Sequence, residues 1–408
     1  MSWDKVKLGD ISTSIQPGPF GSQLHSSDYS TEGTPIIMPK DMIDGHISHS
    51  NLAYVSDDHV NRLSRHQVHC GNLMVARKGD VRKCVFITEN EEGWMTGSDC
   101  LKVALNDEMC VPRYIYYQLR SPFIGKWLET ISIGSTMPSI NTGLLSSIEL
   151  YLPPISVQNR ISEVLTDYDL IIQNNQKQIK LLEEAAQRLY KEWFVDLRFP
   201  GYEGVEIIDG KPEGWIVVNI ENLCSRINAG GTPSRRNRNY WDNPSVKWFK
   251  TGELQDCWLI EPEEKISNEG LNCSSAKIFP RNTILMAIYA SPTLGRLGIL
   301  TSEAACNQAA LCMLADEEKV SWQWLYCKLF ELREDFNAVA KGAGQQNISA
   351  DTVKKKEILL PTKEIIDLFS RLVDPFFIKE LRLQEQNQEL TEARDRLLPK
   401  LMSGEIEL

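Results

Sequence analysis

The sequence of 408 residues contains no long apolar run and no recognisable secretion signal. A membrane-spanning helix needs about 18 or more consecutive apolar residues, and no stretch of this chain approaches that length. The first residues, MSWDKVKLGD, do not show the basic and then apolar order of a signal peptide. We therefore expect a cytoplasmic protein that has no association with a membrane.

The ten cysteines form no CxxC pair and have no regular spacing, so we do not expect a disulfide framework. Basic residues number 44 against 55 acidic ones, which gives a formal charge of −11. Such a balance argues against a protein that coats nucleic acid, but it leaves room for a local basic groove. With 42% hydrophobic and 24% charged residues, a chain of this length predicts more than one globular domain.

Catalytic signatures are also absent from the sequence. There is no GxGxxG loop, no GxxxxGK[ST] loop, no GxSxG elbow, and no Asn/Asp-Pro-Pro-Tyr/Phe loop for holding a flipped base. The spacing of Glu263, Glu264 and Lys265 after Asp256 is only a weak nuclease-like pattern, because such triplets are common in charged loops. We therefore expect no catalytic residue in this chain.

All six histidines lie within the first 69 residues, where His46 and His49 form one HxxH pair and His66 and His69 form another, followed by Cys70. Imidazole and thiolate groups are ligands that zinc prefers. The second half of the chain has no matching pattern, so we favour polar loop histidines and expect no metal site.

An internal repeat organises the chain. Residues 3–8 (WDKVKL) match residues 215–220 (WIVVNI) at an offset of 212. Residues 134–140 followed by 150–153 match residues 342–348 followed by 358–361 at an offset of 208. Because the matched features come in the same order, we predict two related globular domains that differ by loop insertions.

Each copy of the repeat combines two textures. Short β-prone runs broken by Gly, Pro, Asn and Ser fill residues 1–150 and 201–360, whereas residues 155–198 and 364–402 have apolar residues at alternating steps of four and three. Sustained spacing of 3.5 residues is typical of a coiled coil. Two separate amphipathic helices remain the alternative. The helical series are Ile161, Leu165, Tyr168, Ile172, Asn175, Ile179, Leu182, Ala186, Leu189 and Trp193, and then Phe369, Val373, Phe376, Leu383, Leu390, Leu397 and Leu401.

The expected fold class is α+β, with two mixed, mostly β domains separated by two long helices that form an antiparallel coiled coil, in an internal pseudo-twofold repeat. The expected segments are a first globular domain at 1–150, a central helix at 151–200, a second globular domain at 201–360 and a C-terminal helix at 361–408. The polar Asn175 within one seam is expected to fix the register of the helix pair.

Basic residues gather in one segment of each repeat despite the acidic total. Residues 59–88 and residues 225–250 each hold six lysines and arginines against a single acid, and the surplus acids, such as Glu89–Glu92 and Glu261–Glu264, are expected elsewhere. Arginine binds phosphate and guanine edges in bidentate fashion, so each segment predicts a DNA-binding surface. The alternative is a pair of solvated basic loops. The basic residues are Arg62, Arg65, Arg77, Lys78, Arg82 and Lys83, and Arg226, Arg235, Arg236, Arg238, Lys247 and Lys250.

Several motifs give the chain, over essentially its full length, a resemblance to the specificity subunits of type I restriction–modification systems. The most specific motifs are LLPKLMSGEIE from Leu397 and QRLYKEWFVD from Gln187. Others are GPFGSQ at 18–23, GGTPS at 230–234 followed by Tyr240-Trp241, and GRLG at 295–298 followed by Asn307-Gln308.

The resemblance implies two target recognition domains, each reading one half of a bipartite sequence in double-stranded DNA. It also implies that the long helices set the unread spacer and dock two modification (methyltransferase) subunits, and that restriction subunits join them. S-adenosylmethionine, ATP and Mg²⁺ are expected on those partners, and none on this chain. The complex would methylate adenine N6 and would cleave DNA with ATP. A stand-alone nuclease and a coiled-coil adaptor that never touches DNA are the alternatives.

The resemblance and the charge pattern together select candidate DNA-binding residues. For the glycines, the alternative to close approach of DNA is a purely structural role in a turn. For Arg77 and Arg296, the alternative is a structural ion pair. Tyr289 departs from the family pattern at its position. The candidates are Gly18, Phe20, Gly21, Ser22, Gln23, Arg77, Lys78, Arg82, Thr136, Gly231, Thr232, Ser234, Arg235, Arg236, Arg238, Tyr240, Lys250, Tyr289, Arg296, Gln345 and Gln346.

Overall fold

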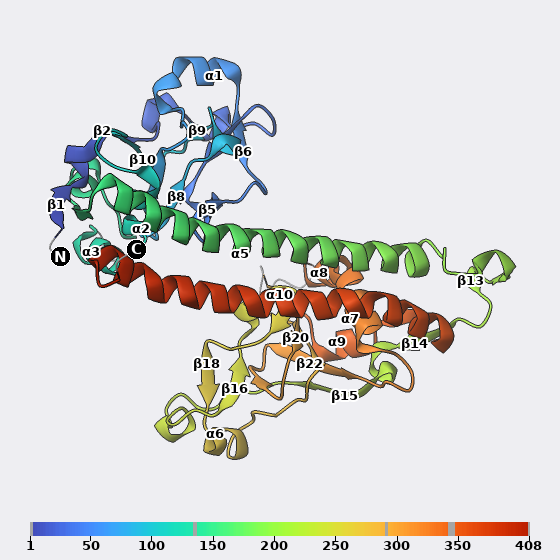
Figure 1. The fold of residues 1–408 in the computed structure, drawn as a ribbon. Coiled ribbons are helices and arrows are strands. Elements are labelled where there is room, and N and C mark those ends of the chain that lie inside the picture. The colour runs from blue at the N-terminus through green and yellow to red at the C-terminus, as the bar shows by residue number, and fades with distance from the viewer. Residues whose placement is uncertain (1–2, 134–136, 290–292, 342–346, 407–408) are drawn as a thin grey trace. The chain divides into compact units, whose positions relative to one another are not determined.

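The computed structural model describes residues 3–133, 137–289, 293–341 and 347–406 (Figure 1). The chain forms two compact units, each containing a globular domain and segments of both long helices. The first unit comprises residues 1–173 with 389–408, and the second comprises residues 174–388. Within the described ranges, no helix is long and apolar enough to cross a membrane. The four-segment division expected from the sequence was drawn from the residue pattern along the chain, and it stays a prediction.

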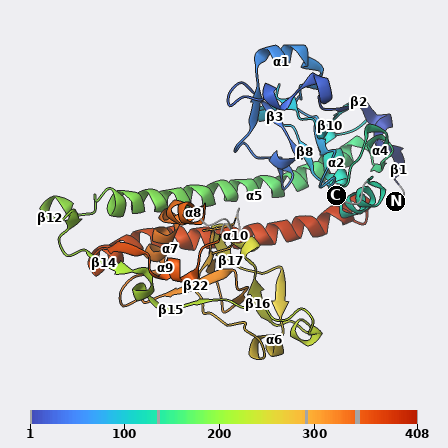
Figure 2. The same cartoon turned by 180° about the vertical axis from the view of Figure 1, so that it is seen from behind.

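The first unit is built around an antiparallel four-stranded sheet in the order β2-β10-β7-β8. Its central strand β10 is buried along nearly its whole length, which explains its run of apolar residues. A three-stranded sheet, β6-β3-β9, lies farther from α5 than α2 does (Figures 1 and 2). The strands of the two sheets are β2 (Ser12–Pro17), β10 (Cys100–Leu105), β7 (Leu73–Ala76), β8 (Cys84–Phe86), β6 (Ala53–Val55), β3 (Thr34–Ile37) and β9 (Met95–Thr96).

Two small strand pairs and several helices complete the first unit. The helix α2 begins at Pro112, where proline lacks only an amide hydrogen that would have no helical partner. The pairs are β1 (Asp4–Lys7) with β11 (Glu149–Leu152), and β4 (Met42–Ile43) with β5 (His46–Ile47). The helices are α1 (Asp57–Arg62), α2 (Pro112–Leu119), α3 (Pro122–Ile131) and α4 (Thr142–Ser146).

The second unit repeats this plan, with a five-stranded sheet β15-β22-β19-β20-β17 and a three-stranded sheet β18-β16-β21. The strands are β15 (Cys224–Ala229), β22 (Ala310–Ala315), β19 (Ile284–Ala287), β20 (Leu297–Leu300), β17 (Cys257–Leu259), β18 (Glu264–Ile266), β16 (Val246–Phe249) and β21 (Ala305–Cys306), with the pairs β14 (Ile216–Asn219) and β23 (Glu357–Leu360), and β12 (Ile207–Ile208) and β13 (Lys211–Pro212). The helices are α6 (Asn268–Asn272), α7 (Trp322–Glu331), α8 (Arg333–Lys341) and α9 (Ala350–Lys354).

Equivalent backbone hydrogen bonds confirm the internal repeat. The amide of Gly18 donates to Cys100 O and the amide of Gly230 donates to Ala310 O, both at 3.0 Å. Likewise, the amide of Ile140 donates to Arg77 O at 2.9 Å, and that of Ile348 donates to Ile288 O at 3.0 Å. The two domains therefore share the plan of their sheets, as the sequence predicted, and the second domain adds β17 to the larger one.

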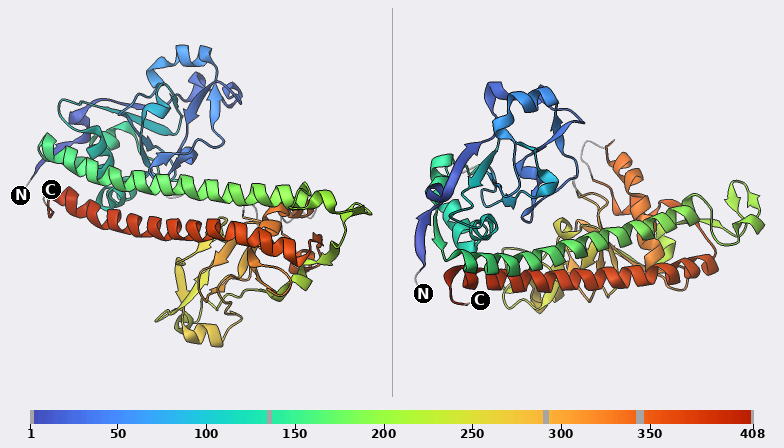
Figure 3. Two further views of the ribbon diagram at one scale, coloured as in Figure 1. Left: turned by 45° about the vertical axis from the view of Figure 1, so that its right-hand side comes forward. Right: turned by 45° about the horizontal axis from the view of Figure 1, so that its top comes forward.

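The long helices α5 (Ile155–Tyr190) and α10 (Lys363–Ser403) pack together in antiparallel directions, which confirms the coiled-coil prediction over two separate helices (Figure 3). In the first unit, Ile161 and Leu165 share a core with Leu398 and Leu401. In the second unit, the rings of Tyr190 and Phe369 lie 5.9 Å apart.

Asn175 lies in the helix seam, as predicted, and donates to Gln386 Oε1 at 3.0 Å and to Asn387 Oδ1 at 2.9 Å. Both bonds lie within the second unit. A buried amide pair of this kind penalises any register that separates its members. The seven-residue series through Val373 and Leu401 also contains Glu380, Asn387 and Arg394, so three of its members are polar.

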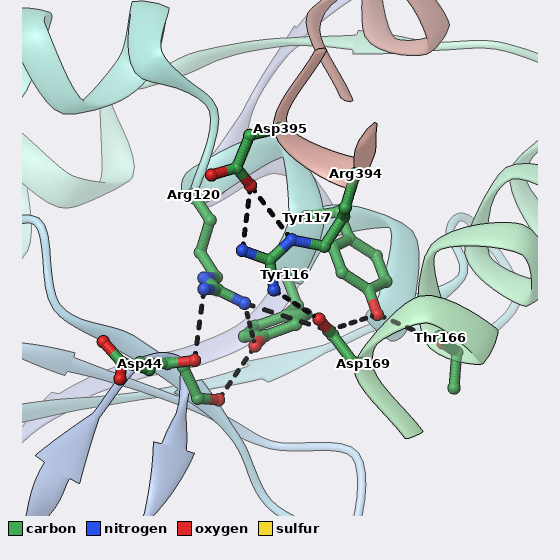
Figure 4. A network of polar contacts seen from close by, with 9 residues as sticks. Asp44, Tyr116, Tyr117, Arg120, Thr166, Asp169, Arg394 and Asp395 are labelled. Atoms are coloured by element: carbon green, nitrogen blue, oxygen red, sulfur yellow. Dashed lines mark hydrogen bonds and ion pairs between the residues drawn. The ribbon is translucent and has the colours of Figure 1, made fainter. Parts of the chain in front are cut away.

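A polar network ties α2, α5 and α10 within the first unit (Figure 4). Asp169 accepts hydrogen bonds from the Tyr117 hydroxyl and from Arg394 Nη1, both at 2.7 Å, and Arg120 Nη1 lies 3.9 Å away. Arg120 also donates to the Tyr116 hydroxyl at 2.6 Å. The side chains of Asp169 and Arg394 are each only 14% exposed, so each charge is stabilised mainly by its partner and little by water.

Candidate nucleic-acid interface

A concave surface of about 480 Å³ opens in the first unit beside the end of β2. Short turns at 21–23 and 64–66 supply half of its lining residues, and Phe20, also part of the lining, is 54% exposed. An exposed aromatic ring of this kind suits stacking on a base or a sugar. The lining residues are Gln16, Pro17, Phe20, Gln23, Arg65 and His66.

Three guanidinium groups surround this surface. Arg62 Nη2 donates to Gln23 O at 2.9 Å, and the Arg77 guanidinium lies 5.6 Å from the centre of the Phe20 ring. Among the residues that the structure describes, Arg62, Arg65 and Arg77 form no ion pair with a carboxylate. These cations are therefore available to phosphate oxygens or base edges.

The buried His66 accepts a hydrogen bond from Arg65. His66 is 4% exposed, and Arg65 Nε donates to its Nε2 at 3.0 Å. Burial, with the charges of Arg65 and Lys102, lowers the pKa of His66, so the ring is neutral and carries its hydrogen on Nδ1. Over the described part of the chain, no group of three or more His, Cys, Asp or Glu side chains is placed to hold a metal ion.

The remaining basic residues of this segment are engaged elsewhere. Lys78 Nζ lies 3.0 Å from Asp99, and Arg82 Nε lies 2.9 Å from Asp80, with Glu129 at 3.3 Å from Arg82 Nη1. Arg82 also lines a second concavity, of about 600 Å³, against α3. The structure therefore groups Arg77 with Phe20 and Gln23, and places Arg82 on a separate surface.

Backbone packing accounts for two of the candidate glycines. A Cβ atom on Gly18 would lie 1.9 Å from Gly97 O, and one on Gly231 would lie 2.2 Å from Ser275 O. Gly21 has φ +62° and open space around it, so its turn needs the left-handed conformation that glycine adopts without strain. The adjacent Ser22 belongs to the same short turn.

In the second unit, the GGTPS segment forms a loop that two tryptophans hold. Trp248 Nε1 donates to Gly231 O at 3.0 Å, and Trp241 Nε1 donates to Ser234 O at 3.2 Å. The Arg235 guanidinium lies 3.6 Å from the centre of the Trp241 ring. Thr232 Oγ1 donates to Gln308 Oε1. The loop is therefore fixed in shape before any ligand binds.

The expectation that Glu261–Glu264 lie away from the basic segment is wrong. Because β16 and β18 are antiparallel neighbours, the turn before β18 returns its acids to the basic side chains. Lys250 Nζ lies 2.6 Å from Glu263 and 3.1 Å from Glu264, and Arg235 Nη1 lies 2.6 Å from Glu264. These contacts raise the pKa of Lys250, and the largest contribution comes from its hydrogen bond to Glu263. They also occupy the triplet on which the nuclease alternative depended.

Arg236 and Arg238 remain the available cations of this loop. Both are exposed, and neither has an ion-pair partner within the residues described. Tyr240 anchors the next turn, since its hydroxyl donates to Cys273 O at 3.1 Å. Thr136, Gln345 and Gln346 lie outside the described residues.

The repeat shows which candidates occupy equivalent positions. Backbone equivalence pairs Arg77 with Ile288, because both amides donate to the carbonyl of the residue that precedes their neighbouring strand, Asp99 or Ala309. The next residues, Lys78 and Tyr289, are therefore equivalent, and Tyr289 is 41% exposed. Arg296, half-buried, lies just before β20. The second copy thus carries an exposed aromatic ring at the position where the first copy carries Lys78.

Some residues of these surfaces were not selected as candidates from the sequence. Gln16 lines the first surface, and Trp248 and Gln308 hold the loop of the second. Arg65 was noted for its charge alone. The Asn307-Gln308 pair is part of the GRLG-containing motif, so that motif was the signal available for Gln308. For Trp248 the signal was its place among the basic residues of 225–250, whereas Gln16 had none, because it sits within an ordinary strand pattern.

Comparison with known proteins gives a family match over most of the chain. The model of the type I restriction modification DNA specificity domain matches residues 1–184 and again residues 212–391. The MjaIX specificity subunit of Methanocaldococcus jannaschii is 25% identical, over 99% of this chain and 93% of its own. The HindI specificity subunit of Haemophilus influenzae is 24% identical over 99% of both chains.

A solved structure is similar in fold. The crystal structure of the type I restriction–modification S subunit from M. genitalium matches with a TM-score of 0.59 and 14% identity, covering 98% of this chain and 96% of that one. The two family-model matches fall on the two copies of the repeat, which are also the two copies of the candidate surface.

Proposed function

Because this chain belongs to the family of type I restriction–modification DNA specificity subunits, we propose that each of its two domains reads one half of a bipartite DNA sequence. The observation that carries this proposal is the repeated surface. In each copy, the equivalent loop that follows the first strand of the larger sheet (from Gly18 and from Gly230) has guanidinium groups without carboxylate partners in the described chain beside or within it. They are Arg77, beside the Phe20 ring, in the first copy and the exposed Arg236 and Arg238 in the second.

The same proposal assigns the chemistry to partner subunits. Specificity subunits are non-catalytic, and this chain would dock two modification subunits along α5 and α10 and set the unread spacer between the half-sites. Those partners would supply S-adenosylmethionine and methylate adenine N6, and restriction subunits would use ATP and Mg²⁺ to cleave DNA. The assembly would act in the cytoplasm, where the host DNA lies.

Mapping methylated adenines across host DNA, with the gene intact and then deleted, tests this function. We expect a bipartite motif that loses methylation on deletion and regains it on complementation. A methylation pattern that is identical with and without the gene, although the modification subunit is expressed, would contradict the proposal.

Replacing Arg236 and Arg238 together with alanine is expected to weaken binding of the full chain to its target duplex by at least about tenfold, because hydrogen bonds from charged donors contribute about 1.5 kcal/mol or more each. The slope of log Kd against log salt should fall by about 0.9 for each phosphate contact that is lost. Fluorescence anisotropy over a range of salt concentrations measures both quantities.

The matched control removes the same charge from the long helices. Arg188 on α5 is 81% exposed, and Arg371 on α10 is exposed. The double substitution R188A/R371A should leave the salt dependence of DNA binding nearly unchanged. If both double variants changed the slope equally, net charge and not the loop would govern binding.

A further inference from the structure

A cavity of about 230 Å³ lies within the second unit, between α5, α7 and α10. Four aromatic side chains form part of its wall, those of Tyr326, Phe330, Phe376 and Phe377. Four carboxyl groups, those of Glu183, Glu184, Asp256 and Glu380, also line it, and Glu184 pairs with Arg188 at 3.5 Å. The space far exceeds the roughly 15 Å³ that one water molecule needs.

Glu380 is a buried acid without a counter-ion. It is 4% exposed, and its one hydrogen bond among the described residues is a long contact of 3.4 Å from Gln384 Nε2. No lysine, arginine or histidine of the described chain lies within ion-pair distance of it. Buried carboxyl groups are normally paired, because an isolated charge in an apolar site is costly.

The cations nearest to the cavity do not supply that partner. Arg333 is committed to Asp256, to which it donates through both terminal nitrogens, with Nη1 to Oδ2 at 2.9 Å. Lys180 lines the cavity but is exposed, and it forms no ion pair with Glu183 or Glu380. Two acids of the cavity, Glu183 and Glu380, therefore have no ion-pair partner among the described residues.

Glu380 also differs from the other polar residues of the helix seam, because it has no complementary partner within the described part of the chain. Of the three polar members of the seven-residue series in α10, Arg394 faces the carboxylate of Asp169 and Asn387 faces the amide of Asn175. The third, Glu380, shares its cavity with another acid, Glu183. Two of the three positions thus have complementary partners within the chain, and the third has a like charge.

We propose that this cavity is a binding site for an organic cation, an alkylammonium or alkylguanidinium group whose charge pairs with Glu380 and Glu183. The aromatic walls suit such a ligand, because a cation is attracted to ring faces and an alkyl stem packs against them. Burial, and then the charge of Glu183, raise the pKa of Glu380 to about 9. Glu380 therefore carries a proton at pH 8, and binding of the cation would release it. This site is independent of DNA recognition.

Titration of the full chain with n-propylguanidinium at pH 8 tests the proposal. We expect saturable binding by isothermal titration calorimetry, with release of a proton detected by comparing buffers of different ionisation enthalpy. The neutral isostere n-propylurea should bind at least tenfold more weakly. The variant E380Q should lose at least tenfold in affinity for the cation and should release no proton.

The matched control is E385Q, which neutralises an exposed glutamate on the same helix and should bind the probe like the wild type. The variant E183Q provides a second measurement and should weaken binding by a smaller factor. Equal binding of the cation and the urea, or equal affinity in E380Q and E385Q, would overturn the proposal.

The natural cation can be a basic side chain of a partner subunit or a free amine, and a competition experiment distinguishes these sources. If a purified modification subunit displaces the probe from the wild type, the occupant is a side chain of that subunit. If the probe and the subunit bind together, the occupant is a free amine. Either result requires the site, whereas failure of the DNA-binding experiments would leave it untouched.

Discussion

Replacing Asp169 with alanine is expected to lower the free energy of unfolding of the first unit by about 2–4 kcal/mol. The substitution removes the carboxylate that contacts both Tyr117 and Arg394, and it leaves two largely buried guanidinium groups, those of Arg120 and Arg394, with less compensating negative charge. The loss falls at the lower end of the range for buried pairs, because Arg394 keeps Asp395 at 2.8 Å and Arg120 keeps the Tyr116 hydroxyl.

Native-state hydrogen exchange measures the stability of each of the two structural units separately. Peptides covering residues 114–119 and 161–173 report on the first unit, and peptides from α7 report on the second. The control E149A removes an acid whose pair with Lys5 is exposed, at 3.5 Å with side chains 61% and 57% exposed, and it should cost less than about 1 kcal/mol. Comparable losses in D169A and E149A would show that the network adds no stability.

The stability of the second unit is expected to fall as pH rises from about 5 to 9. The pKa of Glu380 is raised from its ordinary value of 4.5 to about 9 by burial and by the charge of Glu183. In this window the folded unit keeps a proton that the unfolded chain releases, so each pH unit lowers the free energy of unfolding by at most about 1.4 kcal/mol. Glu183, whose pKa is raised to about 7 by burial and by Asp256 and Glu184, adds to the same trend.

The variant E380Q should remove most of this pH dependence. At pH 8 it is expected to be more stable than the wild type by on the order of 3 kcal/mol, because a neutral amide replaces an acid that deprotonates on unfolding. The groups that face Glu380 remain in place, including Glu183 and Lys180 from α5, Tyr326 from α7 and the Asp256–Arg333 pair. Hydrogen exchange of α7 at several pH values checks the result.

The control for this series is again E385Q, whose exposed side chain should leave the pH profile of the second unit unchanged. A profile for E380Q that is parallel to that of the wild type between pH 5 and 9 would contradict the assignment of the buried proton to Glu380.

The repeat and the helix pair could be predicted from the sequence, because both are patterns of spacing. The offset between Trp3 and Trp215 reflects two copies of one topology, and the spacing through Leu165, Phe369 and Leu383 reflects a seam that must be apolar to be buried. Periodicity reports on burial whatever the partner is, so it needs no tertiary information.

The candidate surfaces could be predicted only in part. Local charge selected Arg77, Arg236 and Arg238, which stand without carboxylate partners in the described chain. The same count failed at Lys250 and Arg235, because strand pairing brings in acids from a turn that follows later in the chain. A count along the sequence cannot include a neighbour that is supplied by an antiparallel register.

The sequence by itself determined the apolar positions of the helix seam and placed the polar Asn175 among them, while Glu380, Asn387 and Arg394 fall between the predicted Val373 and Leu401 at the same spacing. Only the tertiary structure decided what each of them faces. Arg394 meets Asp169, Asn387 meets Asn175, and Glu380 shares a cavity with Glu183. The difference has a physical cause. The seven-residue spacing fixes the position of a side chain on its own helix, whereas the electrostatic state of that side chain depends on the charge that the other helix brings to it.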